Sequence, residues 1–280
     1  MQFFSYLING ISLGSVYALI ALGYTMVYGI AKMLNFAHGD VIMIGSYVVY
    51  FAFGASGLNP VLSIVLSMIV CTILGVVIER LAYRPLREAP SLAVLITAIG
   101  VSYLLQQVAQ LSWSSNPKSF TSVVSGMKPV SLFGGQLTIS AETIVTIVAC
   151  VVIMVVLMWF VNYTPAGHAM LAVSEDRGAA QLMGVNVNGT ISLTFAIGSA
   201  LAAIAGALLC SSYPTLQPTT GAMPGIKAFV AAVFGGIGSI PGAFVGGILL
   251  GIIENLSKAY ISTQLSDAIV FLVLVVVLIV

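Results

Sequence analysis

Residues 144–161 read IVTIVACVVIMVVLMWFV, an apolar run without a charged side chain. A helix crosses the hydrocarbon core of a bilayer with about 20 apolar residues. With its flanking residues, this run is long enough to do so. Runs of similar composition recur along the whole chain, and the sequence therefore predicts a protein that crosses the membrane several times.

The composition of the 280 residues supports this prediction. Hydrophobic residues make up 60% of the chain and charged residues only 6%, whereas a soluble domain has about 25% charged residues. Nine Lys and Arg and eight Asp and Glu are too few to cover the water-facing surface of a chain of this length. The long unbroken runs favour helices over the short alternating strands of a β-barrel.

Several classes of protein are excluded by the same composition. A net charge of +1 provides no basic surface for nucleic acid. Cys71, Cys150 and Cys210 lie singly in apolar runs, and the two histidines have no partner at ligand spacing, so no disulfide or metal site is predicted. The sequence contains no phosphate-binding P-loop and no catalytic arrangement, so we expect neither an enzyme nor a cofactor bound by this chain.

We expect a single all-α transmembrane domain over residues 1–280 with eight or nine spans. The spans near 40–55 and 222–237 are short and interrupted by Gly, which is typical of tilted, broken or re-entrant helices. The expected spans lie near residues 5–29, 40–55, 60–82, 92–111, 141–162, 190–211, 222–237, 241–258 and 264–280.

The order of these spans indicates an internal repeat. The spans that begin near Phe3 and Thr190 lie five spans apart and so run in opposite directions, and a short Gly-interrupted span follows each. Paired broken spans in two oppositely oriented halves are typical of inverted-repeat transporters. The alternative is coincidence, because Gly is common in membrane helices.

The side of the membrane on which each loop lies follows from one cluster of positive charge. Arg80, Arg84 and Arg87 lie together after the third span and indicate the cytoplasm. Alternation then predicts an extracytoplasmic N-terminus and 112–140 loop, and a cytoplasmic 163–187 loop and C-terminus. Residues 130–140 alternate around a Gly-Gly pair, which predicts a β-hairpin. Ser140 is expected to cap the next helix, with Glu142 in its first turn.

Polar residues at the start of the 40–55 span form the first candidate site, which comprises Asn35, His38, Gly39 and Asp40. A carboxylate such as Asp40 at the centre of a membrane helix costs roughly 2.5–3.5 kcal/mol, so it must face a partner, a cavity or a helix terminus. One interpretation is that Asn35 and Asp40 cap a helix at the cytoplasmic surface and that His38 is a loop residue. The other is an unwound segment of a translocation route.

Other charged residues are given structural roles at this stage. Glu254 and Lys258 form an i,i+4 pair that we expect to neutralise two charges at the rim of a span. Lys227 is expected to extend toward the lipid headgroups, the alternative being contact with an acidic external partner.

The 163–187 loop contains the second candidate site. Ser174 is a suitable N-cap, Glu175 and Asp176 favour a first turn, and Gly184 is a natural residue to follow a helix end. The predicted helix has about nine residues, too few to cross the membrane and marginal in water alone. With Ala179, Ala180, Leu182 and Met183 on its surface, it must pack either on its own bundle or against a soluble partner.

Five segments together resemble the permease subunits of branched-chain amino acid ABC importers, the LivH type. The resemblance extends from about residue 9 to the end of the chain, with the motifs in the order of the family. The segments are ALGYTMVYGI at 21–30, NFAHGD at 35–40, ERLAYRPLR at 79–87, the Pro-containing segment 218–229 and GGIGSIPGA at 235–243.

This resemblance implies partners and roles. An importer of this type contains a second homologous permease subunit, two cytoplasmic ATPases that bind ATP and Mg²⁺, and an extracytoplasmic solute-binding protein. It lies in the prokaryotic inner or plasma membrane. The short cytoplasmic helix corresponds to the family's coupling helix, which docks on the ATPase, although His168 and Leu171 replace residues that are often basic there. Its candidate residues are Ser174, Glu175, Asp176, Arg177, Ala179, Ala180, Leu182 and Gly184.

The broken spans are then expected to line the translocation route. Three alternatives stay open: an importer of urea or short-chain amides, a secondary transporter driven by an ion gradient, and a channel or assembly scaffold. The candidate route residues are Asn35, His38, Gly39, Asp40, Gly235, Gly236 and Gly238.

Overall fold

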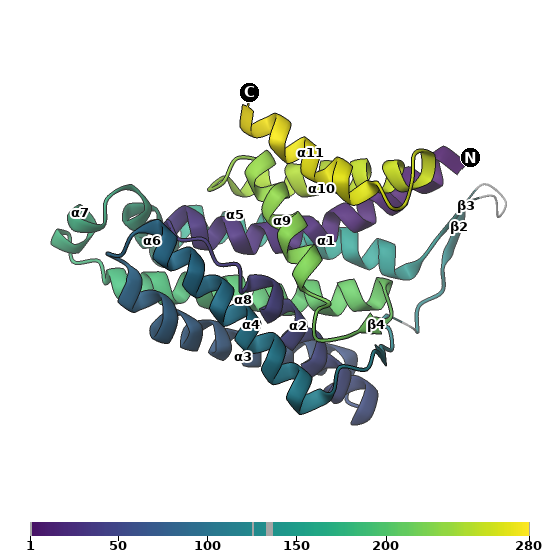
Figure 1. The fold of residues 1–280 in the computed structure, drawn as a ribbon, viewed down its shortest axis with the longest axis horizontal. Coiled ribbons are helices and arrows are strands. Elements are labelled where there is room, and N and C mark those ends of the chain that lie inside the picture. The colour runs from purple at the N-terminus through teal and green to yellow at the C-terminus, as the bar shows by residue number, and fades with distance from the viewer. Residues whose placement is uncertain (1, 125, 133–136, 280) are drawn as a thin grey trace.

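The computed structural model describes residues 2–124, 126–132 and 137–279, and helices dominate these ranges (Figure 1). The α-helices are α1 (Gln2–Ala31), α2 (His38–Val49), α3 (Pro60–Ile78), α4 (Ser91–Trp113), α5 (Ala141–Tyr163), α6 (Pro165–Glu175), α7 (Arg177–Leu182), α8 (Val187–Ser212), α9 (Ala222–Phe234), α10 (Ile240–Tyr260) and α11 (Ser266–Ile279). Short π- and 3₁₀-helices follow α2 and α3: η1 (Tyr50–Ala55), η2 (Glu79–Tyr83) and η3 (Arg84–Leu86). The strands are β1 (Lys118–Ser119), β2 (Val130–Leu132), β3 (Leu137–Ile139) and β4 (Thr215–Leu216).

Six of the helical segments are long and apolar enough to cross a membrane. The prediction of an all-α polytopic membrane protein is therefore confirmed. Two further apolar helices of the described residues, Ala222–Phe234 and Ser266–Val277, are shorter. Helices α2 and α9 coincide with the two spans that the sequence marks as short and Gly-interrupted. The six long segments are Gln2–Ala31, Pro60–Leu86, Ser91–Trp113, Ala141–Tyr163, Val187–Ser212 and Ile240–Tyr260.

Helix α1 is the central element of the bundle. Figure 1 shows it running along the long axis of the molecule, with its N-terminus beside the C-terminal end of α10. The two helices are antiparallel and approach closely because glycines line the contact. A Cβ atom on Gly14 would lie 2.7 Å from the Cα atom of Ile248, and one on Gly251 would overlap the backbone nitrogen of Gly14. Small residues at four-residue spacing permit such close packing of membrane helices.

Helices α2 and α9 begin inside the molecule. After α1, residues 32–37 lead back toward the middle of the bundle, where α2 starts, and after α8 the chain returns through β4 to the start of α9 (Figure 1). The two starting turns are in contact: a Cβ atom on Gly39 would lie 2.6 Å from the carbonyl oxygen of Gly221. The long helices α1 and α8 run in opposite directions, and a short helix that begins inside the molecule follows each of them.

The segment before α5 contains the predicted strands. β2 and β3 pair antiparallel, with Val130 opposite Ile139, and the Gly-Gly connection between them lies outside the described residues. The prediction that Ser140 caps α5 is confirmed, since its Oγ accepts a hydrogen bond from the backbone N–H of Thr143 at 3.3 Å. β1 pairs with β4 and so ties this segment to the start of the second broken region.

The predicted boundary of the short helix in the 163–187 loop is wrong at its N-terminus. A separate helix, α6, begins at Pro165 and runs through Ser174, whose Oγ donates to the carbonyl oxygen of Leu171. The cap of α7 is Asp176, which lies in extended backbone and accepts from two backbone N–H groups at 2.7 and 3.0 Å. Both residue types can cap a helix, and Asp176 caps here because the chain bends at that residue. Gly184 follows the helix end at φ +86°, as predicted.

Candidate functional site

The polar residues before and in α2 are buried. Asn35 accepts a hydrogen bond through Oδ1 from the hydroxyl group of Tyr83 at 2.8 Å, and Asp40 accepts one from the amide of Gln106 on α4 at 2.8 Å. Asn35 and Asp40 are 3% and 1% exposed. The interpretation of Asn35 and Asp40 as helix caps at the cytoplasmic surface is therefore wrong, because both side chains are directed to other helices.

His38 and Gly39 lie where the two short helices meet. The His38 side chain is buried, and its ring centroid is 4.7 Å from that of Tyr24 on α1, so His38 is not an exposed loop residue. Gly39 contacts both Gly221 and Gly225 at the start of α9. Any side chain at position 39 would force these two helix ends apart.

Gly235, Gly236 and Gly238 form the tight turn between α9 and α10. Gly236 and Gly238 have φ values of +87° and +99°, a backbone region that residues with a Cβ atom rarely adopt. A Cβ atom on Gly29 of α1 would lie 3.1 Å from the Cα atom of Gly238. The two groups of predicted route residues thus contact α1 at different places, Gly29 and Tyr24.

Helix α7 protrudes from the molecule at the end opposite to the N-terminus and the β2–β3 pair (Figure 1). Leu182 and Met183 are 90% and 84% exposed. Ala179 is also exposed, whereas Ala180 packs against the hydrophobic core. Ala179, Leu182 and Met183 thus form a small exposed apolar surface, called the apolar knob below, and Ala180 anchors the helix to the bundle.

Arg177 connects this knob to the central helix. Its guanidinium group donates a hydrogen bond to the carbonyl oxygen of Ala31, the last residue of α1. Burial, and next to it repulsion from Arg87, lower the pKa of Arg177 from its ordinary value, but a guanidinium remains charged at neutral pH. Glu175 and Asp176 are exposed beside it.

A second polar network lies near the arginine cluster. The carboxylate of Glu79 is fully buried and accepts hydrogen bonds from Arg87 and from Ser192. Arg87 also donates to Asn188. The network joins the end of the third span to the beginning of α8.

The sequence-based interpretation of Lys227 is wrong. This lysine does not extend to the lipid headgroups but is 6% exposed, with its Nζ 2.8 Å from Glu254 on α10 and 2.6 Å from Asp267 on α11. The predicted i,i+4 bond between Glu254 and Lys258 is confirmed at 2.6 Å, and Glu254 is buried. Tyr17 of α1 completes the group by donating to Glu254 at 2.8 Å.

These five residues, Tyr17, Lys227, Glu254, Lys258 and Asp267, are called the charge cluster below. Sequence reasoning missed the cluster because it judged each charge by its distance from the nearest span end. A usable signal is present nonetheless: two opposite charges on neighbouring apolar helices avoid a large desolvation cost only by pairing.

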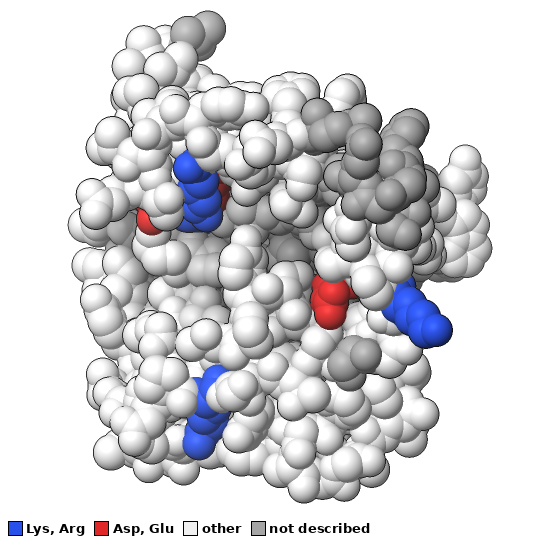
Figure 2. All heavy atoms as spheres, turned by 90° about the vertical axis from the view of Figure 1, so that its right-hand side faces the viewer, with Lys and Arg blue, Asp and Glu red and all other residues white. Residues whose placement is uncertain are grey.

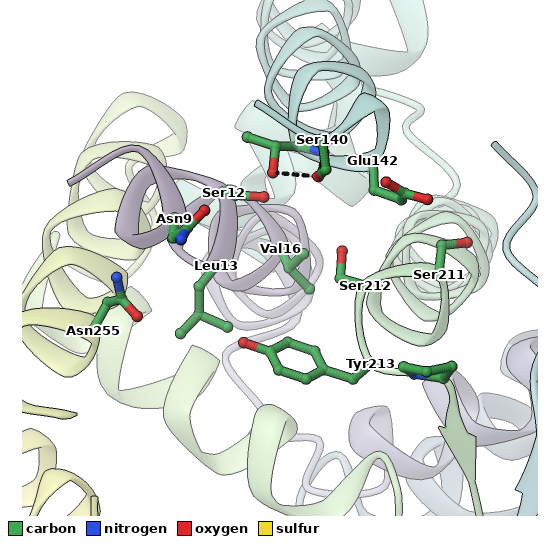
Figure 3. Close-up of a pocket in the computed structure, with 12 residues that line it drawn as sticks. Asn9, Ser12, Leu13, Val16, Ser140, Glu142, Ser211, Ser212, Tyr213 and Asn255 are labelled. Atoms are coloured by element: carbon green, nitrogen blue, oxygen red, sulfur yellow. Dashed lines mark hydrogen bonds between the residues drawn. The ribbon is translucent and has the colours of Figure 1, made fainter. Parts of the chain in front are cut away.

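Two cavities open near the charge cluster. The larger, about 500 Å³, lies between α1, α5, α8 and α10, and polar residues such as Asn9, Ser140 and Asn255 line much of it (Figure 3). A second cavity of about 210 Å³ borders the charge cluster and shares Leu13 and Tyr213 with the first. Figure 3 shows the Tyr213 ring beside the Leu13 side chain, with its hydroxyl group directed toward that side chain.

This end of the molecule carries little charge. Figure 2 views it face-on: its charged side chains are few, and at the upper left a blue side chain lies directly beside red ones on an otherwise uncharged surface.

The fold and these sites define a class of protein: a helical polytopic membrane protein with two broken elements that meet inside the bundle and an apolar knob at one end. A family model described as the permease component of branched-chain amino acid transport systems matches residues 6–278. The chain belongs to this family.

Individual relatives agree with this assignment. The high-affinity branched-chain amino acid transport system permease protein LivH of Salmonella typhimurium is 43% identical, covering 100% of this chain and 94% of LivH. The corresponding protein BraD of Pseudomonas aeruginosa is 44% identical, covering 97% of this chain and 92% of BraD. The ribose import permease protein RbsC of Haemophilus influenzae is 27% identical, covering 86% of this chain and 73% of RbsC.

Proposed function

We propose that this chain is the membrane-spanning permease subunit of an ATP-driven importer of branched-chain or other apolar amino acids. The observation that carries the proposal is the 43% identity to LivH over the whole chain. The solute would arrive on an extracytoplasmic binding protein, and ATP and Mg²⁺ would be bound by separate ATPase subunits.

The orientation in the prokaryotic inner or plasma membrane rests on two features at opposite ends of the molecule. The arginine cluster follows the third span, and clustered Arg favours the cytoplasm. The N-terminus and the β2–β3 pair lie at the end opposite to α7 (Figure 1). We therefore assign the N-terminus, the strands and the cavities to the extracytoplasmic side, and α7 and the C-terminus to the cytoplasmic side.

The energy input is assigned to α7. Its exposed Leu182 and Met183 would enter a groove of an ATPase subunit, and the bond from Arg177 to Ala31 would pass the movement to α1. Alternation between inward- and outward-open states is a rigid-body rearrangement of packed helices in transporters of this kind.

The route is assigned to the region where α2 and α9 begin. Asn35, His38, Gly39 and Asp40 are packed in this structure, and their movement away from α4 and α9 would open a polar path. The turn formed by Gly235, Gly236 and Gly238 would act as the hinge of the other half. A second homologous permease subunit, as the family resemblance implies, would complete the route.

Reconstitution tests the proposal. The chain is placed in proteoliposomes with its companion permease and ATPases, and uptake of labelled leucine is measured with the cognate binding protein outside. We expect uptake that requires both ATP and the binding protein. Uptake that survives ATP depletion and disappears when an ion gradient is removed would instead identify a secondary transporter. Uptake without the binding protein would identify a channel. Uptake of urea or amides alone would identify the alternative importer.

A further inference from the structure

The cavity of about 210 Å³ beside the charge cluster has two chemically different walls. One wall presents Tyr17, Lys227, Glu254 and Lys258, and the other presents apolar side chains, among them Leu209 and Met223. Its volume is several times the ~30 Å³ share of one water molecule, so it admits a solute of several heavy atoms. Charged groups inside membrane segments are costly, pair with one another and commonly mark substrate and ion pathways.

The lysines of this wall retain hydrogen-bonding capacity. An ammonium group has three donors. Lys227 uses one on Glu254 and one on Asp267, and Lys258 uses one on Glu254. One donor of Lys227 and two of Lys258 therefore have no acceptor among the described residues. A carboxylate placed in the cavity would supply one.

The same wall offers acceptors for a positive group. The carboxylate of Glu254 and the hydroxyl groups of Tyr17, Tyr213 and Thr220 line the cavity. With Lys227, Lys258, Glu254 and Asp267, the charge cluster is neutral overall, which suits a ligand that carries one positive and one negative group. The free lysine donors favour its carboxylate. The apolar wall simultaneously favours an uncharged side chain, because it removes apolar surface from water.

The geometry points to a binding site for a zwitterionic apolar amino acid, with the carboxylate at Lys227 and Lys258 and the side chain against Met223. This inference rests on the proposed function and extends that function by placing a solute-binding site within the permease. Leu13 and Tyr213 border this cavity as well as the larger polar one. Solute that enters the larger cavity passes Tyr213 to reach the site.

Thiol protection tests the site in the complete transporter reconstituted in lipid nanodiscs. Met223→Cys introduces a thiol on the apolar wall, and Ile226→Cys introduces one on the same helix outside the cavity, at similar exposure (42% and 39% for the native residues). The native Cys71, Cys150 and Cys210 are buried. Labelling of this chain by a water-soluble thiol reagent is followed by mass spectrometry.

We expect saturating leucine to slow labelling of the Met223→Cys variant by about tenfold and to leave the Ile226→Cys variant unchanged. Leucine methyl ester, which lacks the carboxylate, and 4-methylpentanoate, which lacks the ammonium group, should not protect. Lys258→Gln should raise the leucine concentration needed for protection by about tenfold. Lys258→Arg keeps the positive charge, and it should need about the same leucine concentration as the parent. Lys258 is suitable for this change because a third of its side chain is exposed.

The inference is overturned if leucine does not protect the Met223→Cys variant, if both single-charge analogues protect it equally well, or if the Ile226→Cys variant is protected to the same degree. Uptake by the unmodified complex is measured in parallel. Intact ATP-dependent leucine uptake without protection would reject this site and leave the proposed function in place. Absent uptake together with absent protection would reject both.

Discussion

At the scale of single residues, the charge cluster is the least expected feature of this protein. Lys227 and Glu254 lie on apolar helices, and each is tolerable there only because the other neutralises it. Removing one member of a buried pair leaves an uncompensated charge and is more costly than the pair itself is favourable. The cluster therefore makes the relative positions of α1, α9, α10 and α11 depend on a few side chains.

Glu254→Gln is expected to destabilise the protein strongly, by about 3–5 kcal/mol, because two lysines lose their shared carboxylate. The measurement is the thermal unfolding midpoint of the purified complex in detergent. Glu88→Gln, at an exposed position, serves as the control and should have little effect. Equal midpoints for the two variants would mean that the cluster contributes nothing to the fold.

Asp176→Ala is expected to loosen α7, because two backbone N–H groups lose their acceptor. Loss of an N-cap costs about 0.5–2 kcal/mol, enough to unfold a six-residue helix locally without affecting the bundle. The measured quantity is the number of leucine molecules imported per ATP hydrolysed, which should fall. Asp176→Ser retains a capping oxygen and should restore most of the import per ATP. An unchanged ratio of imported leucine to hydrolysed ATP in the Asp176→Ala variant would argue against coupling through α7.

At the scale of elements, glycine contacts decide which helices are neighbours. α1 and α10 meet along Gly10, Gly14, Gly247 and Gly251, and the starts of α2 and α9 meet at Gly39. In lipid, helices gain little from hydrophobic burial against one another, so close backbone approach and packing contribute most of the association. The same contacts bring Tyr17 close to Glu254.

Gly251→Ala is expected to weaken the contact between α1 and α10, because the added Cβ atom would overlap the backbone of Gly14. Overpacking of this kind costs about 1–3 kcal/mol or more, and the unfolding midpoint in detergent should fall accordingly. In Gly100→Ala on α4 the added atom meets no described neighbour within 4 Å, so that variant should match the parent. A Gly251→Ala protein as stable as the parent would contradict the close packing described here.

At the scale of the whole molecule, the two ends have different characters. One end carries the N-terminus, the β2–β3 pair and the two cavities near the charge cluster, and the other carries the apolar knob formed by α7 (Figure 1). An importer needs this polarity, because solute arrives on one side and the nucleotide is hydrolysed on the other.

Labelling from each side of the membrane tests this polarity. Leu182→Cys should react with an impermeant thiol reagent only in inside-out vesicles, and Lys128→Cys only in intact cells or right-side-out vesicles. The buried native cysteines should give a low background. Reaction of the Leu182→Cys variant from the outside would reverse the orientation and remove the role assigned to α7.

Much of the fold could be predicted from the sequence because its determinants are local. The positions of the long spans depend on apolar length, the cap at Ser140 on a residue three positions away, and the helix end at Gly184 on the backbone freedom of one glycine. The short spans around α2 and α9 were also identifiable from their glycines. The polar residues before α2 and the capped segment 174–184 were candidates from local sequence, and the family resemblance then implied their roles in the route and in coupling.

The tertiary structure alone decided the hydrogen bonds and ion pairs between residues far apart in the chain. Tyr17 and Glu254 are 237 residues apart and Asn35 and Tyr83 are 48 apart, and no local pattern reports such pairs. The capping of α7 by Asp176 likewise depended on where the chain bends after α6. Electrostatic pairing and desolvation are properties of three-dimensional surroundings, so the charge cluster became visible only when the helices were placed side by side.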